Sequence, residues 1–374
     1  MVVMTAQALA VLQPHAIPFD HEELYNAAHA RLIQLEHFEY LFDLQYRGHC
    51  GGCTQHALLG AALFGLMGPS LFVWKLIPIM WVGLMTFAGA CFLLRHHRSA
   101  GALAFGALLL LPPPAFLELS LTAWGNHFES GVAALVVLWM ASRTVRHPSL
   151  LSCGLLGLSL SWALWIGFSS AFLLLAMPFL VWRKLTRRHV FAMLAGLSAI
   201  GLLWAYQHTT TASSPFGTIY YPGESIPALS RVPTKLWSLL APRQLVALFG
   251  ASDSIWGWGA GIATGFCIAS ALWITRHSSA ARSIRILFGS FLLVYCTVRF
   301  TVWTPPSPEI APPGSMRYAA PLYGLSFAAL ALAFDAAWST GKHALAWALI
   351  IPSMAVGIQA RANLFKAPFP DQSV

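Results

Sequence analysis

Long apolar stretches recur along the chain and alternate with short charged or proline- and glycine-rich breaks. Each stretch is close to the ~20 residues that an α-helix needs to cross the hydrocarbon core of a bilayer. The pattern predicts spans at residues 71–94, 100–118, 126–142, 150–166, 168–182, 190–207, 256–275, 284–302, 317–338 and 343–360. Gly167 is the only break within 150–182, so this part predicts either one long tilted helix or two short ones. We therefore expect about nine or ten spans.

The composition agrees with a membrane protein. Hydrophobic residues make up 57% of the 374 positions and charged residues only 9%. These proportions lie outside those of soluble globular domains. The sequence therefore predicts an all-α polytopic membrane protein and excludes a water-soluble core.

Lysine and arginine residues gather in short turns between the predicted spans. Twelve of the 22 are Arg95, Arg98, Arg143, Arg146, Arg183, Lys184, Arg187, Arg188, Arg276, Arg282, Arg285 and Lys342. No acid lies in these turns, and such turns face the cytoplasm in membrane proteins. The longer connections at 1–70, 208–255 and 303–316 then face outward. The net charge of +9 reflects this topology and not a nucleic-acid surface.

This topology divides the chain into five parts. They are an outer acidic segment with interfacial helices (1–70), a first transmembrane block (71–207), an outer loop (208–255), a second transmembrane block (256–360) and a tail (361–374). Residues 1–13 are apolar but too short to span a membrane. Because residues 14–70 must lie outside, we expect either that the following spans translocate them or that a first helix lies upstream.

Acidic residues are scarce, and six of the 13 lie between positions 20 and 43. Asp20 can cap a helix, with Glu22 and Glu23 at the positive end of its dipole. The apolar face of this amphipathic helix is predicted to contain Leu24, Ala28, Leu32, Leu35, Phe38, Phe42 and Tyr46 and to lie on the membrane surface. The later acids, Glu36, Glu39 and Asp43, are expected to form a solvated face. Asp20, Glu22 and Glu23 are candidates for catalysis.

Cys50 and Cys53 form a Cys-x-x-Cys motif that His49 and His56 flank. Such a motif can hold zinc, exchange thiols or form a local disulfide. A zinc site would need four ligands within ten residues, so a disulfide or unpaired thiols are favoured. The other cysteines (Cys91, Cys153, Cys267 and Cys296) fall in predicted spans and are expected to be small packing residues.

A second polar group, Asn126, His127 and Glu129, lies at the outer end of two predicted spans, after Glu118. Polar groups this dense are costly in lipid and should face a cavity, where they could bind a donor, an acceptor or a divalent ion. The alternative is structural, with Asn126 as a helix cap and Glu129 in the capping-box position.

Two stretches resemble a known class of membrane enzyme. The first is the acidic motif before an interfacial helix, with residues 63–71 (Leu-Phe-Gly-Leu-Met-Gly-Pro-Ser-Leu) after it. The second is residues 317–323 (Arg-Tyr-Ala-Ala-Pro-Leu-Tyr), at the start of a late span. In this order, the two stretches are similar to those of the GT-C membrane glycosyltransferases, which include the protein O-mannosyltransferases and the lipid A aminoarabinose transferase.

The resemblance implies a GT-C-like bundle that transfers a sugar from a polyprenyl-phosphate donor to a glycan, lipid or protein acceptor. The reaction would occur at the outer face of a bacterial plasma (inner) membrane. Asp20 matches the family's catalytic acid, with Glu22 or Glu23 as substitutes, although His21 separates acids that are adjacent in the common pattern. No cofactor is certain, and a divalent metal ion is compatible with this chemistry.

Arg317, followed by Tyr318, is the residue expected to bind the donor's lipid phosphate, because a guanidinium group can grip phosphate in two places. The structural alternative is an arginine that snorkels at a helix end. A second hypothesis for the whole chain is a non-catalytic membrane protein or transporter on a related scaffold. A transporter is expected to carry charges at mid-span and often matched halves. Here the acids gather at one end of the membrane, which favours the enzyme.

Overall fold

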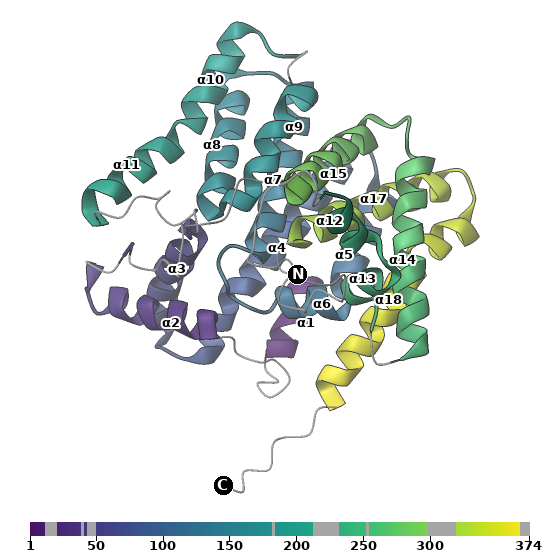
Figure 1. The fold of residues 1–374 in the computed structure, drawn as a ribbon, viewed down its shortest axis with the longest axis horizontal. Coiled ribbons are helices and arrows are strands. Elements are labelled where there is room, and N and C mark those ends of the chain that lie inside the picture. Colours follow the sequence, from purple (N-terminus) through teal and green to yellow (C-terminus); the bar gives the residue numbers. More distant parts are fainter. Residues whose placement is uncertain are drawn as a thin grey trace, which may run out of the picture.

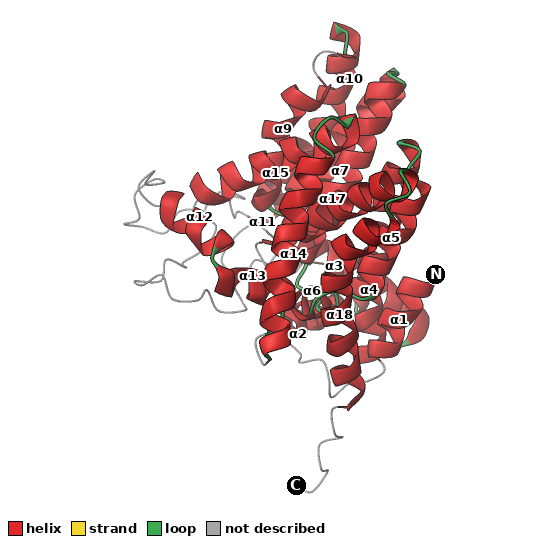
Figure 2. Cartoon of the chain, turned by 90° about the vertical axis from the view of Figure 1, so that its right-hand side faces the viewer, coloured by secondary structure: helices red, strands yellow, loops and turns green. Residues whose placement is uncertain are grey.

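The computed structural model describes residues 1–11, 21–38, 41–42, 50–181, 184–211, 232–251, 254–297 and 319–366. Within these ranges the regular elements are helices, and Figures 1 and 2 show them stacked in one bundle with no strand among them. The predicted all-α polytopic class is confirmed.

Seven stretches of helix in the described part are long and apolar enough to cross a membrane. They are α4 (Leu71–Arg95), α7 (Phe128–Arg146), residues 187–207 of the consecutive helices α10 (Arg187–Leu197) and α11 (Ala199–Thr211), α14 (Ile255–Ile274), α15 (Ser279–Thr297), α17 (Ala320–Ser339) and α18 (His343–Lys366). Helix α17 is the centre of the bundle: it is buried along almost its whole length and packs against α5, α7, α14, α15 and α18.

The predicted span 100–118 is divided in the structure, and the stretch 150–182, for which the sequence predicts one helix or two, is two helices. The stretch 100–118 forms α5 (Ser99–Leu110) and the short α6 (Pro114–Leu119), because consecutive prolines at 112 and 113 interrupt it. The stretch 150–182 forms α8 (Leu150–Ile166) and α9 (Phe172–Val181), with the 3-10 turn η2 (Phe168–Ala171) between them. Helix α8 packs mainly on α7 and α10, whereas α9 packs mainly on α15. This part is therefore two short helices and not one long one.

The first apolar residues form helix α1 (Val2–Val11), which packs against α4 and α5. The Gln7 amide on α1 donates to Ser120 Oγ at 3.0 Å. Arg361 on α18 donates to the carbonyls of Ala6 and Leu110, at 3.0 and 2.8 Å, and to Gln7 Oε1 at 3.1 Å. One buried guanidinium thus joins α1, α5 and α18.

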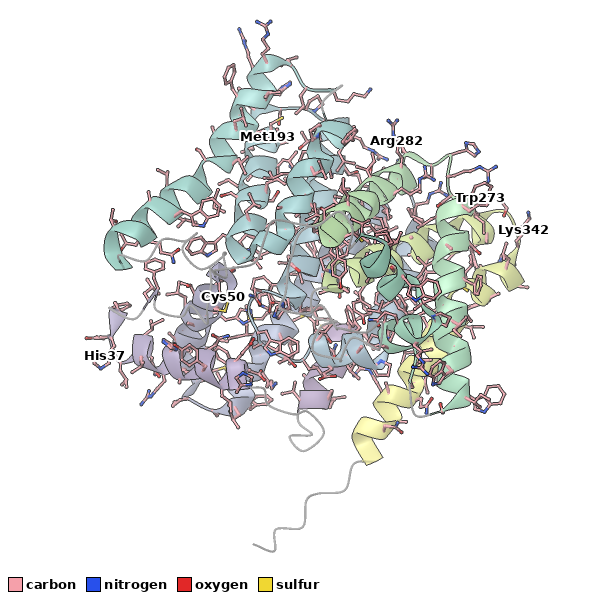
Figure 3. All side chains as sticks on the ribbon, viewed as in Figure 1. His37, Cys50, Met193, Trp273, Arg282 and Lys342 are labelled. Carbon is pink, nitrogen blue, oxygen red and sulfur yellow. A yellow bond between two sulfur atoms is a disulfide. The ribbon has the colours of Figure 1, made fainter. Side chains whose placement is uncertain are left out.

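The basic turns and the acidic helix lie at opposite ends of the bundle. The turns before α10 and between α14 and α15 are at the top of Figure 1, and α1, α2 (His21–Gln34) and α6 are at the bottom. Figure 3 shows Arg282 at the upper edge, away from His37 and Cys50. This separation is the one that the charge pattern predicts.

Asp335 on α17 stabilises the start of α5. Its Oδ2 lies 3.0 Å from Arg98 Nη1, and its Oδ1 accepts the Gly101 N–H at 3.1 Å. Asp335→Ala is expected to cost about 2–3 kcal/mol, because a charged hydrogen bond is lost and a buried N–H is left unpaired. Thermal unfolding in detergent measures this. Asp335→Asn keeps an acceptor for Gly101 and should lose less; an Ala variant as stable as wild type would contradict the capping role.

Candidate active site at the acidic end

A buried ion pair joins α2, α4 and the segment of residues 120–127, which we name the α6–α7 linker. Both carboxylate oxygens of Glu23 lie 2.7 Å from Lys75 Nζ, and Oε1 also accepts the Ala123 N–H at 3.0 Å. Lys75 donates in addition to the Leu121 carbonyl at 2.9 Å. Glu23 is 0% exposed and Lys75 is 2% exposed. The pair therefore fixes the linker against both helices.

Burial raises the pKa of the Glu23 carboxyl above its ordinary value, while Lys75, the Ala123 N–H and His56 act to lower it. Donors hold both of its oxygens, so this carboxylate has the features of an anchor for the linker. Glu22, the preceding residue, is half-buried. Asp20, the predicted base, lies outside the described residues. Of the predicted acids, Glu23 thus has a structural role in holding the linker, and Glu22 is more accessible to solvent.

The predicted apolar face of α2 is exposed in the structure, so its contact with the membrane surface stays a prediction, and another face of the helix is buried in the bundle. Leu24, Leu35 and Phe38 are 44%, 50% and 59% exposed, and the buried positions are Glu23, Asn26, His29, Ala30 and Ile33. The reason is that the inner face supplies partners to polar groups of the bundle: in addition to Glu23, Asn26 Nδ2 donates to the Trp124 carbonyl at 3.1 Å. The helix also ends at Gln34, before Glu36 with its positive φ of 68°, instead of continuing to position 43. Glu36 is exposed as predicted, and Glu39 and Asp43 lie outside the described residues.

The Cys-x-x-Cys motif forms a disulfide at the start of α3 (Gly51–Met67). Between the two cysteines, Gly52 lies so close to the linker that a Cβ atom there would be 1.5 Å from the Gly125 carbonyl oxygen. Gly125 itself has a φ of +96°, which favours glycine. The first turn of α3 therefore docks directly on the α6–α7 linker.

Glu129 lies in a buried polar contact with α3 and α4. Its Oε1 is 3.0 Å from His56 Nε2, which also accepts the Trp81 indole N–H at 2.7 Å. Both side chains are almost fully buried, and neither Glu129 oxygen has a hydrogen-bond donor among the described residues. Such a carboxyl group is costly unless a further donor reaches it.

The capping-box alternative for Asn126 and Glu129 is wrong. Helix α7 begins at Phe128, its cap position is His127, and no side chain caps it. Glu129 contacts His56 and does not reach back to the cap. His127 is 4% exposed and packs edge-to-face with Trp124, and Asn126 is half-buried. We name the region where α2, the first turn of α3 and the α6–α7 linker meet the acidic corner. Asn126, His127 and Glu129 belong to it, and the Glu23–Lys75 ion pair fixes it to α4.

The residues predicted to bind the donor phosphate are not among those that the structure describes. Arg317 and Tyr318 lie outside the described residues. Tyr323 of the same motif is described, and its buried hydroxyl donates to the Leu248 carbonyl at 2.9 Å. In the described ranges no three His, Cys, Asp or Glu side chains are grouped to hold a metal ion, so the divalent ion stays a prediction.

Sequence reasoning missed Lys75 and His56. Lys75 is the only charged residue among positions 71–94, and an ionisable side chain in a span usually has a specific partner. That signal could have found it. His56 was noted only beside the cysteines, and nothing in its spacing from Glu129 indicates their contact.

Neither the comparison with protein-family models nor the comparison with curated proteins gave a match. The fold is similar to the crystal structure of the oligosaccharyltransferase from Archaeoglobus fulgidus in the apo form, with a TM-score of 0.52 and 10% sequence identity over 99% of this chain and 56% of that chain. A structure of the archaeal oligosaccharyltransferase AglB from Archaeoglobus fulgidus, in complex with an inhibitory peptide and a dolichol-phosphate, gives a TM-score of 0.47 with the same identity and coverage. The chain spans about half the length of these proteins, 56% in each case. At 10% identity the first likeness shows a shared membrane fold.

Proposed function

We propose that this protein is a membrane glycosyltransferase that moves a sugar from a polyprenyl-phosphate donor to an acceptor. The observation that carries the proposal is the junction of two polar stretches about 100 residues apart: Ala123 donates to Glu23. This junction brings α2 and the α6–α7 linker together at the end of the bundle opposite the basic turns. The fold likeness to an oligosaccharyltransferase supports the same class of reaction.

In the proposed reaction, Asp20 or Glu22 takes the proton of the acceptor's hydroxyl group. The acceptor oxygen then bonds to the anomeric carbon of the sugar, and the bond from that carbon to the phosphate oxygen breaks. Arg317, with Tyr318, binds the polyprenyl phosphate that leaves, because a guanidinium group compensates its charge. Asn126, His127 and Glu129 contact the donor or acceptor. Glu23 with Lys75 holds the linker that carries Asn126 and His127 and leads into α7, where Glu129 lies.

The site is proposed to face outward from a bacterial plasma membrane. Basic turns remain on the cytoplasmic side, and α2 with its acids lies at the other end. A polyprenyl donor could then present its headgroup at the level of α2 while its chain stays in the lipid. Glycans, lipids and proteins are the acceptor classes that this arrangement allows.

The test is sugar transfer from a polyprenyl-phosphate donor in membranes that contain wild type, Asp20→Asn, Glu22→Gln or the double variant. Loss of a general base is expected to lower the rate by about 100-fold or more in the double variant. Glu36→Gln, at an exposed position on the same part of the chain, is the matched control and should transfer at the wild-type rate. Full activity in both single variants and in the double variant would refute the assignment of the base.

A further inference from the structure

Four arginines gather where α4, α5 and α7 meet at the basic end of the bundle. We name Arg95, Arg98, Arg143 and Arg146 the arginine cluster. Arg146 donates through Nη1 to the Arg95 carbonyl and approaches His96 Nδ1 with Nη2 at 2.9 Å. Arg143 lies one turn earlier on α7. Three helix ends therefore bring their guanidinium groups to one place.

The imidazole of His96 lies among the arginines of this cluster. Burial, then the charges of Arg146, Arg98, Arg95 and His97, lowers the pKa of His96 to about 4. Its other nitrogen, Nε2, lies 2.9 Å from Ser142 Oγ. Every charged group that acts on His96 here is positive.

Negative charge does not balance the cluster within the described residues. Asp335 is the acid that pairs with it there, and it does so through Arg98 alone. The Nε atom of Arg95 is buried and has no hydrogen-bond partner in the described part of the chain. Like charges held together in this way are unfavourable unless an anion joins them.

A cavity of about 240 Å³ is connected to the cluster through Arg98, which lies in its wall. Its other lining residues come from α17 and from the turn between α14 and α15: Ile274, Thr275, His277, Ser278, Leu332 and Ala336. Apolar side chains are also exposed: Ile274 in the cavity wall is 42% exposed, and Leu94, which precedes Arg95 of the cluster, is 53% exposed. The surroundings thus offer guanidinium and hydroxyl groups to a headgroup and apolar surface to its chains.

We propose that the arginine cluster and this cavity bind the phosphate of an anionic phospholipid headgroup, of which phosphatidylglycerol is the simplest representative. Guanidinium groups bind phosphate in a bidentate manner, and basic pockets between transmembrane helices are known to hold phospholipid headgroups. Lipid is favoured over free phosphate because the cluster lies at the ends of apolar helices, beside exposed Leu94. This inference is independent of the proposed glycosyltransferase activity.

The test is lipid binding to the purified full chain in detergent, measured by native mass spectrometry with phosphatidylglycerol, phosphatidylcholine or inorganic phosphate added. If each arginine that contacts the bound headgroup contributes ~1 kcal/mol, Arg143→Gln with Arg146→Gln is expected to weaken phosphatidylglycerol binding roughly 25-fold. The matched control is Arg188→Gln with Arg282→Gln. These residues are exposed at the same end, and their replacement removes the same charge. The control pair should bind phosphatidylglycerol as wild type does.

Equal losses in the two double variants would overturn the proposal, because the lipid would then respond only to net charge. Phosphatidylcholine held as tightly as phosphatidylglycerol, or inorganic phosphate competing equally, would overturn it too. A second measurement uses the wild-type protein and so does not depend on folding of a variant. NMR titration should show the pKa of His96 rising when phosphatidylglycerol binds, and an unchanged titration would contradict the site.

Discussion

Replacing Glu23 with alanine is expected to destabilise the protein by about 3–5 kcal/mol, because the Lys75 ammonium group would stay buried without its carboxylate. The Ala123 N–H would lose its acceptor as well. Lys75→Met should cost about as much, since it leaves the Glu23 carboxylate buried without its cation. Thermal unfolding in detergent is the measurement, and a fall of about 4–6 °C is expected for either variant of this 374-residue chain.

The double variant Glu23→Gln with Lys75→Met is the informative control. It removes both charges, and the glutamine amide oxygen still accepts the Ala123 N–H, so it should be more stable than either single variant. Glu22→Ala, at the half-buried neighbouring position, should unfold within about 1 °C of wild type. If the Glu23 variant unfolds at the wild-type temperature and yet loses transferase activity, Glu23 is catalytic and not an anchor.

The fold could be predicted largely from hydropathy, because backbone groups in a bilayer must be satisfied within helices. All ten predicted spans contain helix in the described part. The hydropathy pattern did not predict that the stretch 100–118 forms two short helices. Helix α5 is only 12 residues long, and its apolar composition runs on through the prolines into α6. Hydropathy alone does not register that interruption.

The sequence predicted which acids belong to the acidic corner, but not the side chains that they contact. Glu23 and Glu129 were selected as functional candidates, and the structure connects their segments through the α6–α7 linker. Their partners, Lys75 and His56, come from other helices, 52 positions from Glu23 and 73 positions from Glu129. Periodicity describes one helix at a time, so it indicated the apolar side of α2, which is exposed, but not which polar side chains the helix buries in the bundle. The contact of that apolar side with the membrane surface stays a prediction.

Gly52→Ala is expected to separate α3 from the α6–α7 linker. The added Cβ would lie 1.5 Å from the Gly125 carbonyl oxygen. Since the obstructing atom is backbone, no side-chain rotation can relieve the clash. Helix α3 would have to move, and with it His56, the contact of Glu129. A loss of about 3 kcal/mol, the upper end of what overpacking usually costs, is expected because the obstructing atom is backbone, together with lower transferase activity at temperatures where the variant stays folded.

Gly65→Ala, in the same helix, is the matched control. No atom lies within 4 Å of a Cβ built at this position, so the substitution should stabilise the helix by about 0.5–1 kcal/mol. The unfolding temperature should therefore fall for Gly52→Ala and rise slightly for Gly65→Ala, whereas sugar transfer should fall only for Gly52→Ala. If Gly52→Ala were as stable and as active as Gly65→Ala, the close approach of α3 to Gly125 would not be needed. The contact of Gly52 with Gly125 would then not be what positions His56 against Glu129 in the acidic corner.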